Sequence, residues 1–111
     1  MSQKTIIEEI RAERRRQMDV EGWTPHHDDG HAGGELARMA ACYAAFHETL
    51  SIPKRHAIDD LWPWGDFLGR DGEKKIRRKT PRERLVIAGA LILAEIERLD
   101  RRSEDADAID Q

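Results

Sequence analysis

The sequence has one cysteine, few aromatic residues and no long apolar run. The single cysteine, Cys42, excludes a disulfide within the chain and is typical of a protein in a reducing compartment. The longest apolar run, Leu85 to Ala94, is too short to span a bilayer, and no apolar signal segment is found in the first thirty residues. We therefore expect a cytoplasmic protein that does not enter a membrane.

Neither sign of charge dominates. The 111 residues include 19 lysines and arginines against 22 aspartates and glutamates, so the whole chain is not a general binder of polyanions. No DNA-reading or RNA-reading motif is found, and nucleic acid is not the expected partner. Alanine is abundant and strict polar–apolar alternation is missing, which favours an all-α fold over strands.

Capping patterns and apolar spacing predict three main helices. Thr5–Glu8 and Thr80–Glu83 both have the sequence of a capping box, in which a hydroxyl and a glutamate satisfy exposed backbone amides. Apolar residues at spacings of three and four indicate another helix between these two starts. The predicted helices cover about residues 5–21, 34–50 and 80–102.

The helix predicted at 80–102 has the strongest apolar pattern. Its first half is apolar nearly all round, so we expect it to be central to the core, with the interface of a homodimer as an alternative role. The residues predicted to form its main buried face are Leu85, Ala88, Gly89, Ile92, Ile96 and Leu99.

The rest of the chain is predicted to be irregular. Residues 51–79 form a long connector that contains tryptophan and proline. Residues 103–111 are acidic and have little apolar surface to bury, which predicts a disordered tail. The expected organisation is one helical domain, residues 1–102, followed by this tail.

The run from Glu21 to Glu35, EGWTPHHDDGHAGGE, is rich in side chains that bind metals or ligands. Its imidazole and carboxylate groups suit zinc, manganese or iron better than magnesium. Its spacing matches no stringent zinc motif. A metal-free ligand site and a hydrogen-bonded structural corner are therefore open alternatives for this run.

Tryptophans and a basic block suggest a ligand that carries phosphate. Tryptophans in predicted loops either cover the edge of a core or stack on a base. The basic block from Lys74 to Arg84 leads into a helix N-terminus, a plausible phosphate site, although a solvated charged surface is the alternative. The candidate ligand-binding residues are Trp23, Asp28, His31, Trp62, Trp64, Arg78, Lys79 and Arg82.

Two segments resemble a widespread group of short α-helical proteins from bacteriophages and prophages. They are EGWTPHHDDGHAGGELARMAACYA at Glu21–Ala44 and AGALILAEIERLDR at Ala88–Arg101, with WPW at 62–64 as a third shared element. The resemblance implies a phage accessory protein in the cytoplasm of a bacterial host. The stretch Asp66–Lys79 departs from the pattern, because further tryptophans usually follow WPW.

A second resemblance is to MazG-like nucleotide pyrophosphohydrolases, which hold magnesium with a Glu-Glu-x-x-Glu-Leu motif and a later Glu-x-x-Asp. Glu35-Leu36 matches the end of the first motif, and Glu97 with Asp100 matches the second. His31 and Ala32 occupy the places of the paired glutamates, which should weaken binding of a hard cation. The resemblance implies Mg²⁺ or Mn²⁺ as cofactor. Its candidate ligands are Asp28, His31, Glu35, Glu97 and Asp100.

Three functions follow from these observations. The preferred one is a phage accessory protein that binds a nucleotide or nucleotide-derived ligand without turnover, and so sequesters a host signal. The second is a metal-dependent enzyme of the MazG-like type that releases diphosphate from nucleoside triphosphates. The third is a helical module that forms a homo-oligomer or binds a host protein.

Overall fold

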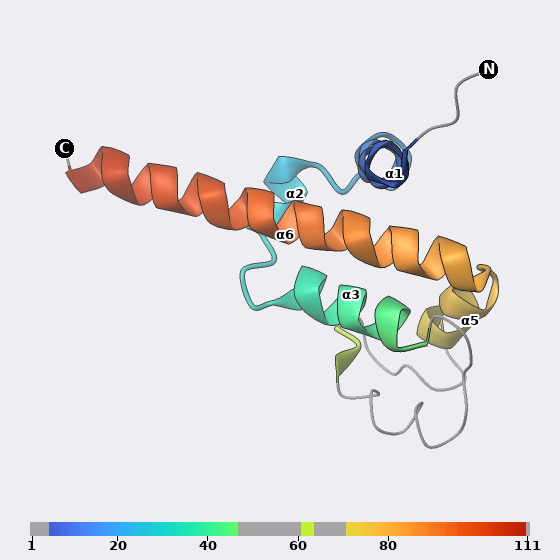
Figure 1. Ribbon diagram of the computed structural model, residues 1–111. Coiled ribbons are helices and arrows are strands. Elements are labelled where there is room, and N and C mark those ends of the chain that lie inside the picture. The colour runs from blue at the N-terminus through green and yellow to red at the C-terminus, as the bar shows by residue number, and fades with distance from the viewer. Residues whose placement is uncertain (1–4, 47–60, 64–70, 111) are drawn as a thin grey trace.

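The computed structural model places one long helix, α6 (Pro81–Asp110), at the centre of the molecule (Figure 1). It describes residues 5–46, 61–63 and 71–110, of which 71–72 and 105–110 are described by their backbone alone. The other helices are α1 (Ile6–Asp19), α2 (Pro25–Asp29), α3 (Glu35–Ala45) and α5 (Asp71–Arg77).

The arrangement around α6 has α1 on one side and α3 on the other, with α2 close to its middle and α5 near its start (Figure 1). The described residues contain no strand, so the prediction of an all-α fold is confirmed. None of the described helices is both long enough and apolar enough to cross a membrane.

Both predicted capping boxes are present. The Glu8 amide donates to the Thr5 hydroxyl over 3.1 Å, and the Glu83 amide donates to the Thr80 hydroxyl over 3.2 Å. In each pair the glutamate accepts a hydrogen bond from the threonine amide in return. These contacts satisfy amides that the first turn of a helix leaves open, and they explain why α1 and α6 begin where the sequence predicts.

Two short helices were not predicted. α2 begins like α6, because the Thr24 hydroxyl accepts from the His27 amide and Pro25 occupies the first helical position. α5 lies inside the connector that was predicted to be irregular. Helices of five and seven residues carry too little periodic pattern to be recognised from the sequence alone.

The core lies mainly between α3 and α6. Leu36, Met39 and Tyr43 of α3 are buried, as their spacing predicts. On α6 the small residues Ala88 and Ala94 are buried beside Leu91, which allows the two helices to approach closely. Other core side chains come from α5 and from residues that follow or lie between the helices: Phe46, Trp62 and Ile76.

The predicted buried face of α6 is wrong in most positions. Leu85, Ile92, Ile96 and Leu99 are 46–49% exposed. The face toward α3 contains the residues Ile87, Ala88, Leu91 and Ala94 instead. Because the first half of α6 is apolar nearly all round, its pattern could not choose the inward face, and the alanine-rich surface of α3 packs against the face with smaller side chains.

The chain also differs from prediction at both ends. On α1 the apolar residues Ile6 and Ile7 are exposed, although apolar residues of a helix are expected to face the core, whereas Arg14 and Gln17 are buried. At the other end, residues 103–110 continue α6 rather than forming a disordered tail. No glycine or proline interrupts this segment, and extending an existing helix costs much less than starting one.

Candidate functional site

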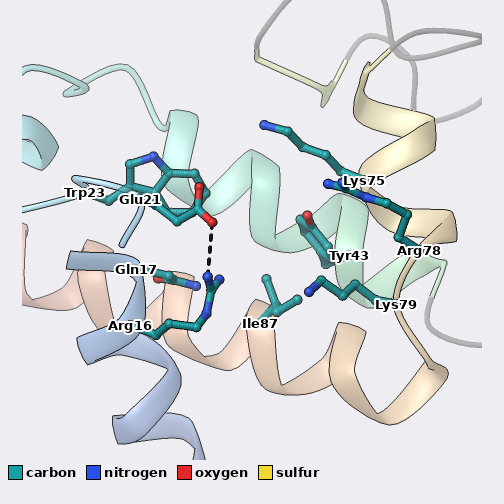
Figure 2. A pocket seen from close by; sticks show the side chains of 9 residues that line it. All are labelled: Arg16, Gln17, Glu21, Trp23, Tyr43, Lys75, Arg78, Lys79 and Ile87. Carbon is teal, nitrogen blue, oxygen red and sulfur yellow. Dashed lines mark hydrogen bonds and ion pairs between the residues drawn. The ribbon is translucent and has the colours of Figure 1, made fainter. Parts of the chain in front are cut away.

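A pocket lies where the basic block meets the loop that carries Trp23. Figure 2 shows Trp23 and Glu21 on one side of this pocket and Arg78 and Lys79 on the other. Its cavity volume is about 80 Å³, which has room for a phosphate-sized group but not for a whole nucleotide. The lining residues are Arg16, Gln17, Glu21, Trp23, Tyr43, Lys75, Arg78, Lys79 and Ile87.

The basic side of the pocket is held in place by α5. Ile76 of α5 is fully buried in the core, which fixes the helix that carries Lys75. Arg84 of α6 is also buried and donates 2.8 Å hydrogen bonds to the carbonyl oxygens of Ile76 and Phe46. This arginine therefore joins the ends of α3 and α5 to α6, and it is not an exposed phosphate ligand.

Trp23 lies on the opposite side of the pocket and is held there by hydrogen bonds of its backbone. Its amide donates to the carbonyl oxygen of Gln17 over 2.9 Å, and its own carbonyl accepts a 2.8 Å hydrogen bond from Arg14. Gly22 has a φ of 78°, a left-handed conformation that favours glycine and turns the chain after α1. The indole packs against the core edge while it lines the pocket.

The pocket has an excess of positive charge. Arg16 is neutralised by ion pairs with Glu13 at 2.8 Å and with Glu21 at 3.1 Å, and these partners raise its pKa. Within the described part of the chain, the side chains of Lys75, Arg78 and Lys79 form no ion pair with a carboxylate, although the charge of Lys79 helps to lower the pKa of Glu83. Three cationic groups at one small cavity favour an anionic ligand.

Two neutral polar groups also line the pocket. Burial raises the pKa of Tyr43 to about 12, so its phenol stays protonated and can donate a hydrogen bond. Gln17 is fully buried and donates to Glu13, while its side-chain oxygen has no partner among the described residues. A ligand that offers both phosphate oxygens and an N–H or O–H donor would match this set.

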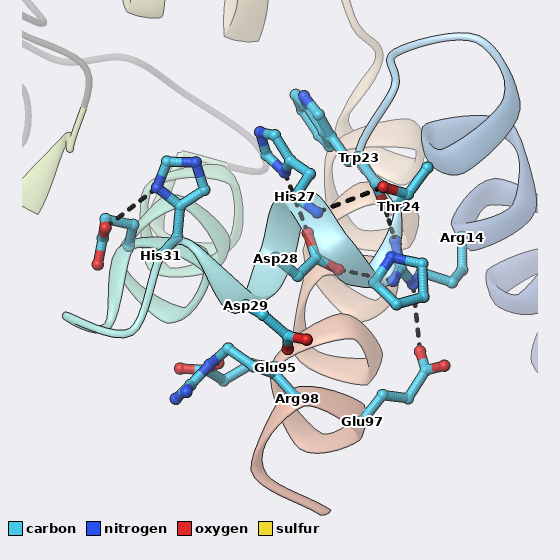
Figure 3. Close-up of polar contacts among 12 residues, drawn as sticks. Arg14, Trp23, Thr24, His27, Asp28, Asp29, His31, Glu95, Glu97 and Arg98 are labelled. Atoms are coloured by element: carbon cyan, nitrogen blue, oxygen red, sulfur yellow. Dashed lines mark hydrogen bonds and ion pairs between the residues drawn. The ribbon is translucent and has the colours of Figure 1, made fainter. Parts of the chain in front are cut away.

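The run Glu21–Glu35 forms a hydrogen-bonded corner beside the pocket (Figure 3). Asp28 is fully buried and accepts a 2.7 Å hydrogen bond from the guanidinium of Arg14. The same guanidinium donates to Glu97 of α6 over 3.1 Å. Arg14 thereby ties α1, α2 and α6 together, which supports the structural interpretation of Asp28 and Glu97.

Other polar residues of the run also form pairs. His31 contacts Glu35 at 3.1 Å, one helical turn along the chain, and its ring lies 4.6 Å from that of His27. A hydrogen bond from its own backbone amide, supported by His31, lowers the pKa of Glu35. Asp29 accepts from Arg101 of α6 at 2.8 Å. These contacts order the corner, and an open cavity of about 460 Å³ lies beside it, lined by Asp29, Ala32, Arg98, Arg101 and Arg102.

The candidate metal ligands come together at most in pairs. Asp28 and Glu97 both engage Arg14, while Glu35 pairs with His31. Asp100 is exposed on α6. Within residues 5–46, 61–63 and 71–110 there is no group of three or more His, Cys, Asp or Glu side chains that could hold a metal ion. The residues present therefore do not fit the Mg²⁺ or Mn²⁺ site that the MazG-like resemblance implies.

The predicted ligand residues divide into two groups. Trp23, Arg78 and Lys79 line one pocket, although they are far apart in the sequence. The others lie elsewhere. Trp62 is buried beside Tyr43, with ring centroids 6.5 Å apart. Arg82 forms a bidentate ion pair with Glu9. Asp28 and His31 belong to the corner, and Trp64 lies outside the described residues.

Several pocket residues were not predicted. Lys75 belongs to the basic block and Arg16 follows two other arginines on α1, so local positive charge is the signal that could have found both. Gln17 and Tyr43 carried no such signal, because a glutamine among charged residues and a tyrosine on an apolar face are common features of helices. Only the packing of α1 against α3 and α6 shows that they share a cavity.

The chain has no match among protein-family models, curated protein sequences or solved structures. Its function is therefore argued from the pocket and the corner beside it.

Proposed function

We propose that this protein binds a nucleotide or nucleotide-derived ligand without turnover, with a phosphate group in the pocket between Trp23 and Arg78. The supporting observation is a cluster of three cationic side chains at a cavity of phosphate size, none of which forms an ion pair with a carboxylate of the described residues. Charge-assisted hydrogen bonds to phosphate are stronger than neutral ones, so this cluster would supply most of the affinity.

The size of the cavity implies that it encloses only part of the ligand. One phosphate group fills the cavity of about 80 Å³, and the rest of the nucleotide lies at its mouth. Trp23 is partly exposed there, and stacking of a base on an aromatic ring contributes about 1–3 kcal/mol. A base at the mouth and a phosphate inside would make use of both predicted features, the loop tryptophan and the basic block.

Binding without turnover agrees with the chemistry of the lining residues. The one carboxylate among them, Glu21, accepts a hydrogen bond from Arg16, and the Tyr43 phenol stays protonated at neutral pH. A general base needs a pKa near the working pH and a free path to the proton that it removes. For this reason, and because no three of the candidate metal ligands converge among the described residues, we prefer binding to pyrophosphohydrolase activity.

The biological role that we propose is sequestration of a host signalling nucleotide by a phage accessory protein. It follows from the resemblance of Glu21–Ala44 and Ala88–Arg101 to short phage and prophage proteins. A binder that holds its ligand intact lowers the free concentration of that ligand. It needs only a tight pocket and a sufficient number of copies, with no catalytic group.

Calorimetry with a panel of mononucleotides and cyclic dinucleotides tests this proposal. Arg78→Ala is expected to weaken binding of the best ligand by about 10- to 100-fold, since a hydrogen bond to a charged group contributes about 1.5–3 kcal/mol. Lys79→Ala should act in the same direction, and added salt should weaken binding by the unaltered protein.

Arg77→Ala is the matched control for this experiment. Arg77 lies next to Arg78 and carries the same charge, but it is bound to Glu73 and does not line the pocket. Its replacement should change affinity by less than about threefold, as expected for an exposed charge outside the site. The proposal is wrong if no member of the panel binds, or if Arg77→Ala weakens binding as much as Arg78→Ala does. Release of diphosphate with Mg²⁺ or Mn²⁺ would favour the enzyme alternative.

A further inference from the structure

α6 has an apolar outer face, formed by Leu85, Ile92, Ile96 and Leu99. Each of these side chains is nearly half exposed, at 46–49%. Scattered exposed leucines are ordinary, but four large aliphatic side chains exposed on one face of one helix can mark an interaction site. No described residue of the chain covers this outer face to the extent that α3 covers the opposite side of α6.

The spacing of the outer face is that of a helix-pairing seam. Successive members are seven, four and three residues apart, and Gly89 occupies the vacant position in this heptad pattern. A Cβ atom added to Gly89 would lie 3.2 Å from a methyl group of Ile10, so α1 borders the seam at this point. The seam is therefore open to a second helix along one side, beside α1.

The charge along this part of the chain is polarised. The exposed side chains of Lys74, Arg77 and Arg78 lie just before the start of α6. Beyond the outer face, Asp100 and Glu104 are exposed and flank Arg101 and Arg102, and the last turns of α6, residues 105–110, carry three aspartates in the sequence and no lysine or arginine. Two parallel copies would align like charges, whereas two antiparallel copies would place acidic ends beside basic ends.

We propose that the protein forms an antiparallel homodimer through the outer face of α6. The two-fold axis lies close to Ile92, the middle of the face, and places Leu85 of each copy beside Leu99 of the other. The outer face is self-complementary under this operation, as a two-fold interface requires. At about 1.5 Å per residue, the 30-residue helix is about 45 Å long, so the acidic end of each α6 reaches the basic end of the second copy.

Light scattering and sedimentation over a range of concentrations test this interface. Ile92→Glu and Ile96→Glu, tested separately, are each expected to raise the dimer dissociation constant at least 100-fold. Each substitution buries two negative charges, one from each copy, at the two-fold axis or next to it. Ile6→Glu is the matched control, since Ile6 is 66% exposed and lies off the outer face. Circular dichroism should show unchanged helix content in all three variants. A monomer at all concentrations, or a dimer that Ile92→Glu leaves intact, overturns the proposal.

Disulfide cross-linking tests the antiparallel orientation. Leu85→Cys and Leu99→Cys proteins, mixed and oxidised, should cross-link to each other, while Leu85→Cys alone should not cross-link to itself. Cys42 is fully buried and does not compete in this reaction. Efficient cross-linking of Leu85→Cys to itself indicates a parallel dimer and overturns the antiparallel arrangement. High salt should weaken the antiparallel dimer, and a dimer strengthened by salt contradicts the charge argument.

Discussion

Arg14→Met is expected to lower the free energy of unfolding by about 3–5 kcal/mol, the usual cost of leaving one member of a buried ion pair without its partner. Asp28 is fully buried and would lose its arginine partner, keeping only its contact with the His27 ring at 3.3 Å. The carbonyl oxygen of Trp23 would lose its hydrogen bond at the same time. Urea denaturation followed by circular dichroism measures the change, which is a large fraction of the stability of a domain of this size.

Two further variants define the cause of that loss. Arg15→Met removes the neighbouring, exposed arginine and should change stability by less than about 0.5 kcal/mol. Arg14→Met combined with Asp28→Leu removes both charges and should recover much of the stability, because no buried charge is left unpaired. If the double variant is as unstable as the sum of the two single variants, the ion pair is not the reason for the effect.

Stability is expected to fall by about 4 kcal/mol between pH 8 and pH 11 through two buried acids, Cys42 and Tyr43. Burial raises the pKa of both to about 12, from ordinary values of 9.0 and 10.0. Above pH 9 the unfolded chain can release these protons while the folded protein retains them. The contribution to stability is therefore complete below pH 9 and is lost as the pH rises toward 12.

Cys42→Ala and Tyr43→Phe separate this effect from other groups that titrate in the same range, such as the lysines. Each replacement should flatten the decline in the free energy of unfolding between pH 8 and pH 11. The larger change, of about 3 kcal/mol, is expected for Cys42→Ala, since the pKa shift of the thiol is larger. Denaturant titrations at several pH values measure it. If the free energy of unfolding depends on pH in the same way for Cys42→Ala and for the unaltered protein, burial does not raise the pKa of the thiol.

The corner and the pocket are coupled through Arg14. This residue holds the Trp23 carbonyl, and Trp23 forms one side of the pocket. The histidine- and aspartate-rich run thus supports the candidate site from outside instead of forming it. A sequence containing this many ligand-type side chains suggested a metal centre, but Asp28 and Asp29 pair with Arg14 and Arg101, and so join α2 to α1 and α6.

Local sequence was enough to predict the main helices. The capping boxes at Thr5 and Thr80 act within one turn, so neighbouring residues are sufficient to specify them. The buried face of α3 was also predictable, because Leu36, Met39 and Tyr43 alternate with exposed residues at helical spacing. The inward face of α6 was not predictable, since Leu85 and Leu91 are equally apolar and only the position of α3 distinguishes them.

For the candidate site, the sequence by itself determined the chemical groups: a loop tryptophan at Trp23 and a cationic segment around Arg78. Only the tertiary structure decided that these two features share one cavity and that Asp28 forms an ion pair with Arg14. The physical reason is range. Helix starts and charge clusters depend on residues within a few positions of each other, whereas pockets and buried ion pairs depend on how α1, α3 and α5 pack against α6.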